Sequence, residues 1–462
     1  MPRSVLLCLA VLGATCLALP AAAAASPRQT MSFEAPRDLR DPATRDAALD
    51  EIAGLGVRAL RVILYWQDVA PQPQSRVKPA FDETDPAAYD WGAYEATIDG
   101  ARARGMRILL TVTGPVPRWA TNGAKDNVTR PSPNEFQKFM QAVGRHYGDR
   151  VDAFSIWNEP NQPQFLGPQF DARHRPASPR IYRGLVFAAQ RGLQRVGLAD
   201  KPLLLGETSP QGTGKVVAPL TFLRGTLCLD ARYHRAKGCG RLDVDGYAHH
   251  AYTTKVGPLF RPPSPNAVTI GVLPRLTHAL DRAAAAGAIP RRLPVYLTEF
   301  GIQSVPDPNF GVSFLRQAEY RAIAERIAWD NPRVVWFSQY LLRDDLPRED
   351  GPAAQRYSGF ESGLRTAAGR PKVALEAFPL PLAARRHGSR VSLWGLVRRA
   401  QGPTSVEVEY SSGGGYRRLT TVRTSARGSW RQTTAFRAGR RYRVVWRAPD
   451  GTTQTSPGMR AY

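Results

Sequence analysis

The chain has 462 residues, 43% of them hydrophobic and nine of them Trp, so it is long enough for a large and a smaller folded domain and too apolar for a disordered protein. Its formal net charge of +24 comes mostly from Arg dispersed along the chain. No compact Lys/Arg run or nucleic-acid motif accompanies that charge. The composition therefore argues against a nucleic-acid partner and favours a solvated basic surface that could meet anionic polymers.

Residues 1–25 have the parts of a secretory signal peptide: a cationic start, an apolar run and an Ala tract. We expect an exported protein without a membrane span, and a lipoprotein anchor at Cys16 is the weaker alternative. Cys8 and Cys16 would leave with the signal peptide. The remaining pair, Cys228 and Cys239, predicts a disulfide in an oxidising compartment, with two free thiols as the alternative. Scattered His residues beside two Cys do not predict a metal site.

Residues 30 to about 378 alternate short apolar runs with amphipathic segments, the pattern of parallel βα units. Eight strands are predicted: Thr30–Glu34, Val57–Tyr65, Arg107–Thr113, Val151–Asn158, Pro202–Thr208, Val244–Ala251, Pro294–Phe300 and Arg333–Leu341. Eight repeats favour an α/β fold, a closed (β/α)8 TIM barrel over residues 26–378, whose chemistry would lie at the carboxyl ends of the strands. An open doubly wound sheet is the alternative, but the chain lacks its Gly-rich phosphate fingerprint.

The pattern changes after Phe378. Pro379, Pro381 and the Ala-Arg stretch behind them suggest a linker, and short alternating strands with Gly-rich turns follow. Five strands are predicted: Val391–Val397, Ser405–Tyr410, Tyr416–Thr424, Ser429–Phe436 and Arg441–Arg447. Residues 379–462 are therefore expected to form a small all-β sandwich. This segment has sixteen Arg, no Lys and three acids, a formal charge of +13, which suits either a spacer with a solvated basic face or contact with an anionic wall polymer.

The strongest chemical signal is the sequence Trp-Asn-Glu-Pro-Asn at residues 157–161, directly after a predicted strand. Hydrolysis of a glycosidic bond needs two carboxyl groups that flank the bond, one of which protonates the leaving oxygen. Glu159 at a strand end, beside an amide that could hold a sugar hydroxyl, suits the proton donor. The alternative is a Glu that caps the following helix or pairs with an Arg.

A second strand, Val295-Tyr-Leu-Thr-Glu299, also ends in a Glu, three βα units later. Strands four and seven face each other across the mouth of a barrel, so Glu159 and Glu299 could converge on one substrate atom. A structural carboxylate is the alternative for Glu299 taken alone. The two residues together predict a pair of catalytic carboxylates.

These two motifs, 140 residues apart, resemble those of the clan A glycoside hydrolases, particularly families 39 and 5. The resemblance runs through nearly the whole barrel and includes these segments: Arg61 with Trp66 and Pro71, residues 89–91, residues 117–120, residues 250–252, residues 340–344, Gly363-Leu364 and Pro371-Lys372. It implies that Glu159 is the acid/base, that Glu299 is the nucleophile of a retaining mechanism, and that Asn158 grips the sugar 2-hydroxyl. Arg61 and Tyr252 would stand beside Glu299 and favour its charged form.

The supporting residues have structural alternatives as well. Arg61 could be an ion-pair partner, and His250 and Tyr252 could be hydrogen-bonded core residues. Further candidate sugar contacts are Trp66, Trp119 and Trp336, which could instead fill space, and Glu207, a subsite or scaffold carboxylate. Tyr340 stands where the family usually has a Trp under the reacting sugar, and this departure puts the preferred sugar in doubt.

The sequence thus predicts an exported, monomeric glycosidase that cleaves O-glycosidic bonds of an oligo- or polysaccharide by double displacement, with no metal or organic cofactor. Two alternatives stay open: a wall protein that binds carbohydrate without cutting it, and a transglycosylase with the same residues. The identity of the sugar, the linkage and the choice between internal and terminal cleavage depend on loop geometry.

Overall fold

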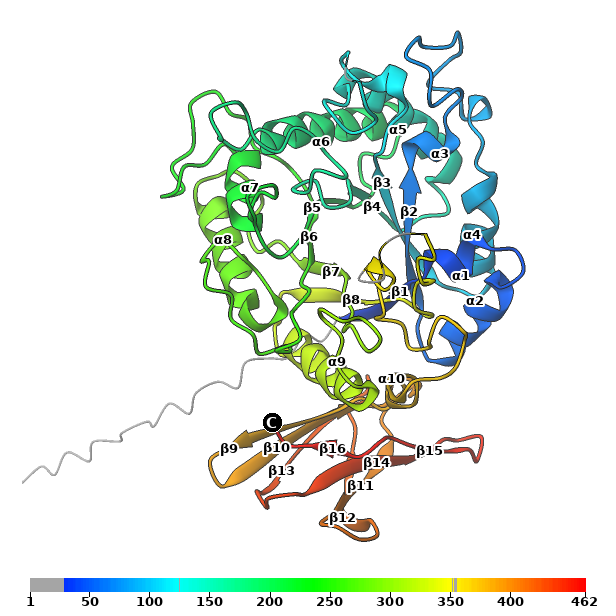
Figure 1. Ribbon diagram of the computed structural model, residues 1–462, viewed down its shortest axis with the longest axis vertical. Coiled ribbons are helices and arrows are strands. Elements are labelled where there is room, and N and C mark those ends of the chain that lie inside the picture. Colours follow the sequence, from blue (N-terminus) through cyan, green and yellow to red (C-terminus); the bar gives the residue numbers. More distant parts are fainter. Residues whose placement is uncertain (1–28, 124, 351, 353–354) are drawn as a thin grey trace, which may run out of the picture.

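The computed structural model describes residues 29–123, 125–350, 352 and 355–462, so the predicted signal peptide lies outside the described residues. Eight parallel strands, β1 to β8, close into a barrel in sequence order, which confirms the predicted fold (Figure 1). The strands are β1 Thr30–Glu34, β2 Ala59–Tyr65, β3 Arg107–Thr113, β4 Ala153–Ile156, β5 Leu203–Thr208, β6 Gly246–His250, β7 Val295–Glu299 and β8 Val334–Tyr340. Each predicted barrel strand contains the observed one.

Helices surround the barrel. They are α1 Pro36–Arg40, α2 Arg45–Gly54, α3 Trp66–Val69, α4 Gly92–Ala103, α5 Pro133–Tyr147, α6 Ser178–Arg195, α7 Pro219–Thr226, α8 Leu273–Ala285, α9 Phe314–Trp329 and α10 Val373–Ala377. Helix α5 buries an apolar stripe that includes Phe136, Phe139 and Met140, because its apolar residues recur every three or four positions.

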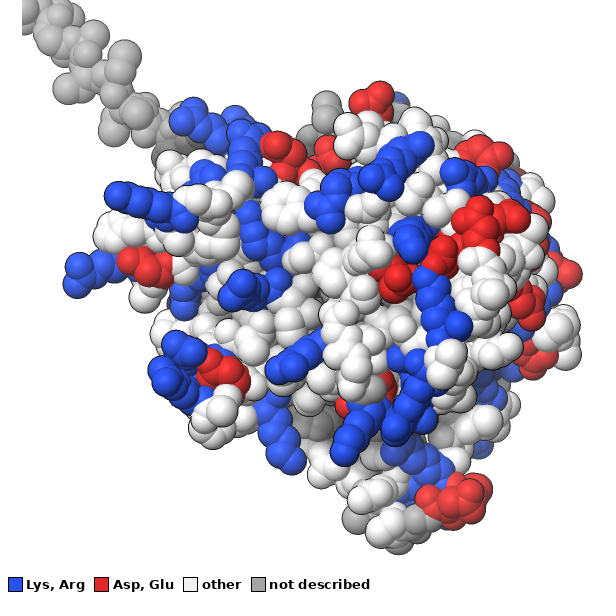
Figure 2. Space-filling view, turned by 90° about the horizontal axis from the view of Figure 1, so that it is seen from above, with Lys and Arg blue, Asp and Glu red and all other residues white. Residues whose placement is uncertain are grey.

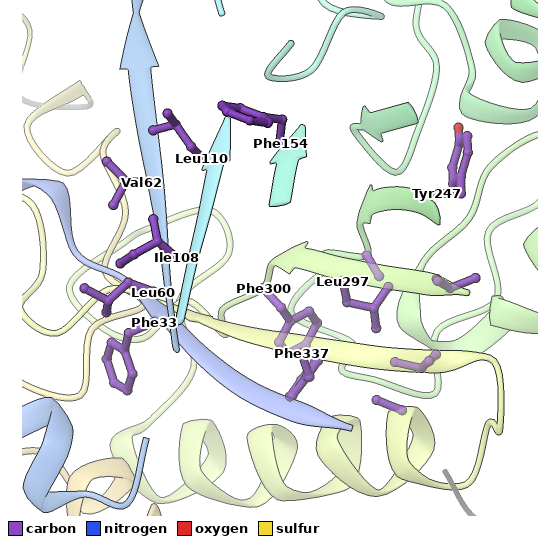
Figure 3. Packing of buried hydrophobic residues seen from close by; sticks show 14 of the residues in the cluster. Phe33, Leu60, Val62, Ile108, Leu110, Phe154, Tyr247, Leu297, Phe300 and Phe337 are labelled. Carbon is purple, nitrogen blue, oxygen red and sulfur yellow. The ribbon is translucent and has the colours of Figure 1, made fainter. Parts of the chain in front are cut away.

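Alternation along each strand separates two environments. Residues such as Leu60, Ile108 and Phe337 point outward and pack in the layer between strands and helices (Figure 3). Their neighbours point into the barrel, where Ala59, Leu109 and other apolar residues form a small interior cluster. Polar residues occupy the inward positions nearer the carboxyl ends of the strands, so the side chains able to react or to bind a polar ligand lie at that end of the barrel.

The C-terminal segment forms two antiparallel sheets beside the barrel. One has the order β13-β10-β9, and the other contains β12, β11, β14, β15 and β16. Their bounds are β9 Leu382–His387, β10 Arg390–Leu396, β11 Ser405–Ser411, β12 Arg417–Arg423, β13 Ser429–Ala435, β14 Arg441–Arg447, β15 Thr453–Thr455 and β16 Met459–Arg460. The predicted linker is wrong at β9, because Leu382, Ala383 and Ala384 are buried against the barrel and the rest of the β-domain.

Helix α9 joins the two domains. On its outer side, Ile323 and Trp329 pack with Ala383, Trp394 and Leu396 of the β-domain. Glu325 is also buried there and receives hydrogen bonds from Arg398 of the β-domain at 2.8 and 2.9 Å. The helix is therefore covered by the barrel on one side and by the β-domain on the other, and the two domains share one continuous interior.

Cys228 and Cys239 form the predicted disulfide in the loop between α7 and β6. On the face drawn in Figure 2, Lys and Arg side chains are scattered among uncharged and acidic ones, and no single compact basic patch dominates it. Within the described part of the chain, no helix has both the length and the apolar character needed to cross a membrane.

Candidate active site

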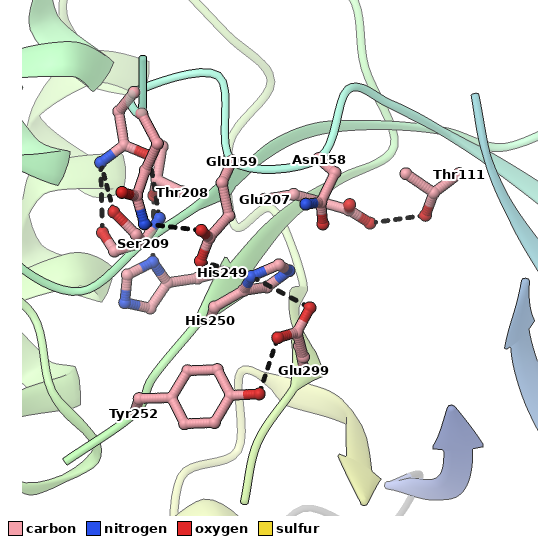
Figure 4. Close-up of polar contacts among 12 residues, drawn as sticks. Thr111, Asn158, Glu159, Glu207, Thr208, Ser209, His249, His250, Tyr252 and Glu299 are labelled. Carbon is pink, nitrogen blue, oxygen red and sulfur yellow. Dashed lines mark hydrogen bonds and ion pairs between the residues drawn. The ribbon is translucent and has the colours of Figure 1, made fainter. Parts of the chain in front are cut away.

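Glu159 and Glu299 come together at the carboxyl end of the barrel (Figure 4). Glu299 is the last residue of β7, and Glu159 lies three residues beyond the end of β4. The Nδ1 atom of His250, at the end of β6, lies 2.9 Å from Oε1 of Glu159 and 3.5 Å from Oε2 of Glu299. One imidazole nitrogen thus bridges the two carboxylates, so both side chains reach the same small region.

The charge of His250 responds to this position. Burial disfavours its imidazolium, but the carboxylates of Glu299 and Glu159 more than compensate and raise the pKa of His250 above its ordinary value. The adjacent His249 behaves differently. Burial lowers the pKa of His249 to about 4, and its two ring nitrogens contact the hydroxyl of Thr208 at 3.0 Å and the carbonyl of Val268 at 2.8 Å. His250 faces the two acids, whereas His249 is a neutral core residue.

Arg61 on β2 is the cation at the centre of the site and is fully buried. Its guanidinium donates to Oε2 of Glu207 at 2.5 Å, to Oε2 of Glu299 at 3.2 Å and to Oδ1 of Asn158 at 2.7 Å. It also makes a close ion pair with Glu34. Because it contacts both Asn158 and Glu299, Arg61 fixes the relative positions of a predicted sugar contact and the predicted nucleophile.

Glu34, at the end of β1, is a site residue that sequence reasoning missed. It lines the same cavity as Glu159 and Glu299. Burial raises the pKa of Glu34 to about 8, with the negative charge of Glu299 adding to the shift and the attraction of Arg61 opposing it. Burial and the nearby charge of Glu299 thus favour the protonated form of Glu34, and the contact with Arg61 opposes them.

Tyr252 and Tyr340 complete the wall around Glu299. The hydroxyl of Tyr252 donates to Oε1 of Glu299 at 2.6 Å. Tyr340 ends β8 and lines the cavity. Burial raises the pKa of both phenols well above the ordinary value, so both keep their protons as hydrogen-bond donors.

These residues surround a cavity of about 530 Å³, a size typical of ligand pockets. The carboxyl ends of seven of the eight strands, or the segments that follow them, contribute to its lining; examples are Tyr65, Phe165, Pro210, Thr253, Phe310 and Phe360. Gln162, also in the lining, donates to Oε2 of Glu159 at 2.7 Å. Polar groups converge near Glu159 and Glu299 while aromatic rings stand around them, the combination that recognises a sugar ring.

The backbone that carries Glu159 is tightly held. The amide of Glu159 donates to the carbonyl of Glu207 at 3.0 Å, and both residues have positive φ angles, +38° and +49°. Asn161 accepts a hydrogen bond from the amide of Ser209 at 2.9 Å and donates to the carbonyl of Val217 at 2.9 Å. Strained conformations of this kind persist only where the surroundings enforce them, and they gather at functional sites.

The predicted tryptophan contacts do not fit the structure. Trp66 is fully buried, and its ring stacks on that of Phe139 with 4.8 Å between the ring centroids. The ring of Trp119 lies edge-on to the ring of Trp66. Trp336 packs in the barrel interior near the amino ends of the strands, beside Ala59. All three are absent from the cavity lining, because each ring is taken up by the apolar core. Glu207 is likewise a scaffold carboxylate, fully buried between Arg61 and Thr111.

Among the residues that the structure describes, no group of three or more His, Cys, Asp or Glu side chains is arranged to hold a metal ion.

Comparison with known proteins finds similarity to glycoside hydrolases over part of the chain. Residues 23–166 match the family model for cellulase (glycosyl hydrolase family 5), a stretch that includes Glu159. A 112-residue segment is 29% identical to a beta-glucosidase from Agrobacterium sp.. That segment covers 24% of this chain and 22% of the relative, so the chain matches about a fifth of that protein's length.

Solved structures share the fold at low sequence identity. A family 39 glycoside hydrolase from Bacteroides cellulosilyticus matches with a TM-score of 0.52 and 17% identity, over 90% of this chain and 80% of that one. A glucosidase from Croceicoccus marinus matches with a TM-score of 0.51 and 12% identity, over 93% of this chain and 95% of that one. Both matches extend beyond the barrel, since the barrel alone ends near residue 378.

Proposed function

We propose that this chain, a clan A glycoside hydrolase by its fold and its family 5 match, cleaves O-glycosidic bonds of an oligo- or polysaccharide with retention of configuration. The bridge that His250 makes between Glu159 and Glu299 carries this proposal. The two bridged oxygens can be no farther apart than the sum of 2.9 and 3.5 Å. A short separation of this kind supports the roughly 5–5.5 Å spacing of retaining enzymes over the roughly 6.5–9.5 Å that inverting enzymes use to seat a water molecule.

In the first step, Glu159 donates a proton to the leaving oxygen while Glu299 attacks the anomeric carbon and forms a glycosyl ester. Tyr252 and Arg61 hold one oxygen of Glu299 each, at 2.6 and 3.2 Å, and so orient the carboxylate for attack. In the second step, Glu159 accepts a proton from water, which attacks the ester and releases the sugar. The charge of Glu299 disappears in the ester and returns on hydrolysis, so the change in this charge assists the switch of Glu159 from acid to base.

We also infer export of the protein. The cationic start, apolar run and Ala tract of residues 1–25 support it, and the disulfide between Cys228 and Cys239 suits an oxidising compartment. A polymeric carbohydrate outside the cell is the corresponding substrate.

Substitution of the two glutamates tests the assignment of the acids. We expect Glu159→Ala and Glu299→Ala each to lower hydrolysis of the best substrate in a panel of nitrophenyl glycosides by about 10³-fold or more. Added azide should restore turnover in both variants, because a small nucleophile fits the space that each side chain leaves. The glycosyl azide should have retained configuration from Glu159→Ala and inverted configuration from Glu299→Ala.

Glu376→Ala provides the matched control, since Glu376 is exposed on α10 and outside the cavity lining. It should retain wild-type activity. Unchanged hydrolysis by Glu299→Ala would reject Glu299 as the nucleophile. Azide products of the opposite configurations would mean that Glu299 is the acid/base and Glu159 the nucleophile.

A further inference from the structure

A groove runs between the barrel and the β-domain at the opposite end of the strands from Glu159 and Glu299. It consists of two adjoining hollows of about 340 and 710 Å³. The smaller hollow lies at the first residue of β1, the first residue of β3 and the turn between β12 and β13. Gly56, Arg58, Arg398 and Ala400 line both hollows, so the two form one elongated groove.

Positive charge dominates the smaller hollow. Arg58, Arg107, Arg398 and Arg427 line it, and among the described residues of its lining Glu325 is the acidic one. Glu325 is already engaged, by Arg398 at 2.8 Å and by Arg321 at 2.9 Å. The acid therefore does not neutralise the remaining three arginines.

Those three guanidinium groups are held in place by neutral partners. Arg58 donates to the carbonyl oxygens of Ala53 and Val57 at 2.7 and 2.8 Å, and Arg427 donates to the carbonyl of Gln29 at 2.8 Å. Arg107 contacts the hydroxyl of Thr30 and lies over the ring of Trp336 at 5.8 Å. Across the described residues, none of the three forms an ion pair with a carboxylate, so the hollow presents oriented donors without counter-charge.

The cations also repel one another. Partial burial and the nearby charge of Arg107 lower the pKa of Arg427. An anion between the two guanidinium groups would relieve that repulsion and could accept paired hydrogen bonds from each. Arg399 extends the positive charge along the larger hollow, where Asp450 is the acidic residue within the described part of the lining.

We propose that this groove binds a segment of an anionic glycan, with a carboxylate or sulfate group seated between Arg107 and Arg427 and the chain continuing past Arg58 into the larger hollow. The length of the groove favours a polymer segment over an isolated anion. The choice of a glycan over another polyanion rests on the proposed function. Bound there, the glycan would keep the enzyme on its polymer while the cavity at the other barrel end stays free for cleavage.

Binding of defined oligosaccharides to matched variants of the full chain tests the proposal. Arg107→Gln/Arg427→Gln removes two charges from the groove, and Arg417→Gln/Arg418→Gln removes two charges from exposed positions on β12 that do not line it. With oligogalacturonate and with a sulfated oligosaccharide as probes, we expect the groove variant to bind at least one of them about tenfold more weakly than wild type. The control variant should change affinity less than about twofold, because its cations are distant from the bound segment.

Equal weakening in both variants would overturn the proposal, because the affinity would then come from net charge alone. Equal affinity for polyglutamate would overturn the choice of a glycan, and equal affinity for inorganic sulfate would overturn the choice of a polymer. Thermal unfolding of both variants checks that they fold. Hydrolysis of the nitrophenyl glycoside should be unchanged in the groove variant, whereas Glu299→Ala should bind the oligosaccharide as wild type does, so failure of this proposal is distinct from failure of the proposed function.

Discussion

Glu299 owes its orientation to two neighbours of different chemistry. Tyr252 supplies a neutral hydrogen bond at 2.6 Å to one oxygen, and the buried Arg61 supplies a charged one at 3.2 Å to the other. Hydrogen bonds to a carboxylate contribute about 1.5–3 kcal/mol each, so either neighbour is strong enough to affect catalysis. The two contacts also restrict rotation of the carboxylate, which keeps its attacking oxygen aimed at the cavity.

Removal of the Tyr252 hydroxyl should slow the enzyme without unfolding it. We predict that Tyr252→Phe lowers kcat/KM for a nitrophenyl glycoside by about 10- to 100-fold, because the ring stays packed while the bond to Glu299 is lost. Tyr410→Phe in the β-domain, far from the cavity lining, is the control and should keep wild-type kinetics. Wild-type kcat/KM in Tyr252→Phe would show that the hydroxyl does not hold Glu299 during the reaction.

Glu34 makes stability depend on pH. Its folded pKa of about 8 lies above the ordinary 4.5, so the unfolded chain loses this proton first as pH rises. The associated stability is fully present below about pH 4.5 and is lost as pH rises through about 8. We predict that the free energy of unfolding of wild type, measured by urea titration and compared with that of Glu34→Gln, falls between pH 5 and 9. Parallel curves for the two proteins would mean that Glu34 ionises normally.

The sequence identified some site residues and missed others for physical reasons. Glu159 and Glu299 end predicted strands and have distinctive neighbours, so strand order alone brings them together. Glu34 also ends a strand, but the residues around it have no recognisable motif, and only the closed barrel brings Arg61 against it. The burial of Trp66 depends on the packing of α5 residues such as Phe139, which its own local sequence does not reveal.

At the scale of elements, α9 depends on Glu325 to balance two buried arginines. Glu325 contacts Arg321 of the same helix and Arg398 of the β-domain, and all three side chains are at least 95% buried. Burial lowers the pKa of Arg321 to about 10 even with this partner. The carboxylate therefore joins the two domains and compensates charges that water cannot reach.

Neutralising this carboxylate should destabilise the protein. We predict that Glu325→Gln lowers the free energy of unfolding by about 3–5 kcal/mol, the usual cost of leaving a buried charge without its partner. Denaturant titration measures the change. Glu376→Gln, at an exposed position of α10, is the control. A loss below about 1 kcal/mol in Glu325→Gln would contradict the role assigned to this contact.

The barrel was more predictable than the β-domain. Eight apolar runs separated by helical segments are typical of a closed barrel of eight parallel strands. Each predicted strand of the barrel contains the strand that the structure shows. Strand β9 was missed because Leu382-Ala-Ala-Arg-Arg-His has small residues and a basic end, the composition of a linker. Its apolar half is nevertheless buried, since Ala383 packs with Ile323 and Trp329 of α9, a contact between segments more than 50 residues apart.

At the scale of the whole molecule, the two ends of the barrel carry different groups of charged residues. The carboxyl ends of the strands surround the carboxylate pair, and the amino ends contribute Arg58 and Arg107 to a cationic groove shared with the β-domain. The β-domain thus contributes both to stability, through α9, and to the groove.

Trapping of the covalent intermediate tests the central claim most directly. Incubation with an activated 2-deoxy-2-fluoro glycoside of the preferred sugar should slow release of the glycosyl group, and mass spectrometry of the intact protein should show one added sugar. Peptide mapping should place that sugar on Glu299. A label on another residue, or a product of inverted configuration by proton NMR, would contradict the double-displacement mechanism.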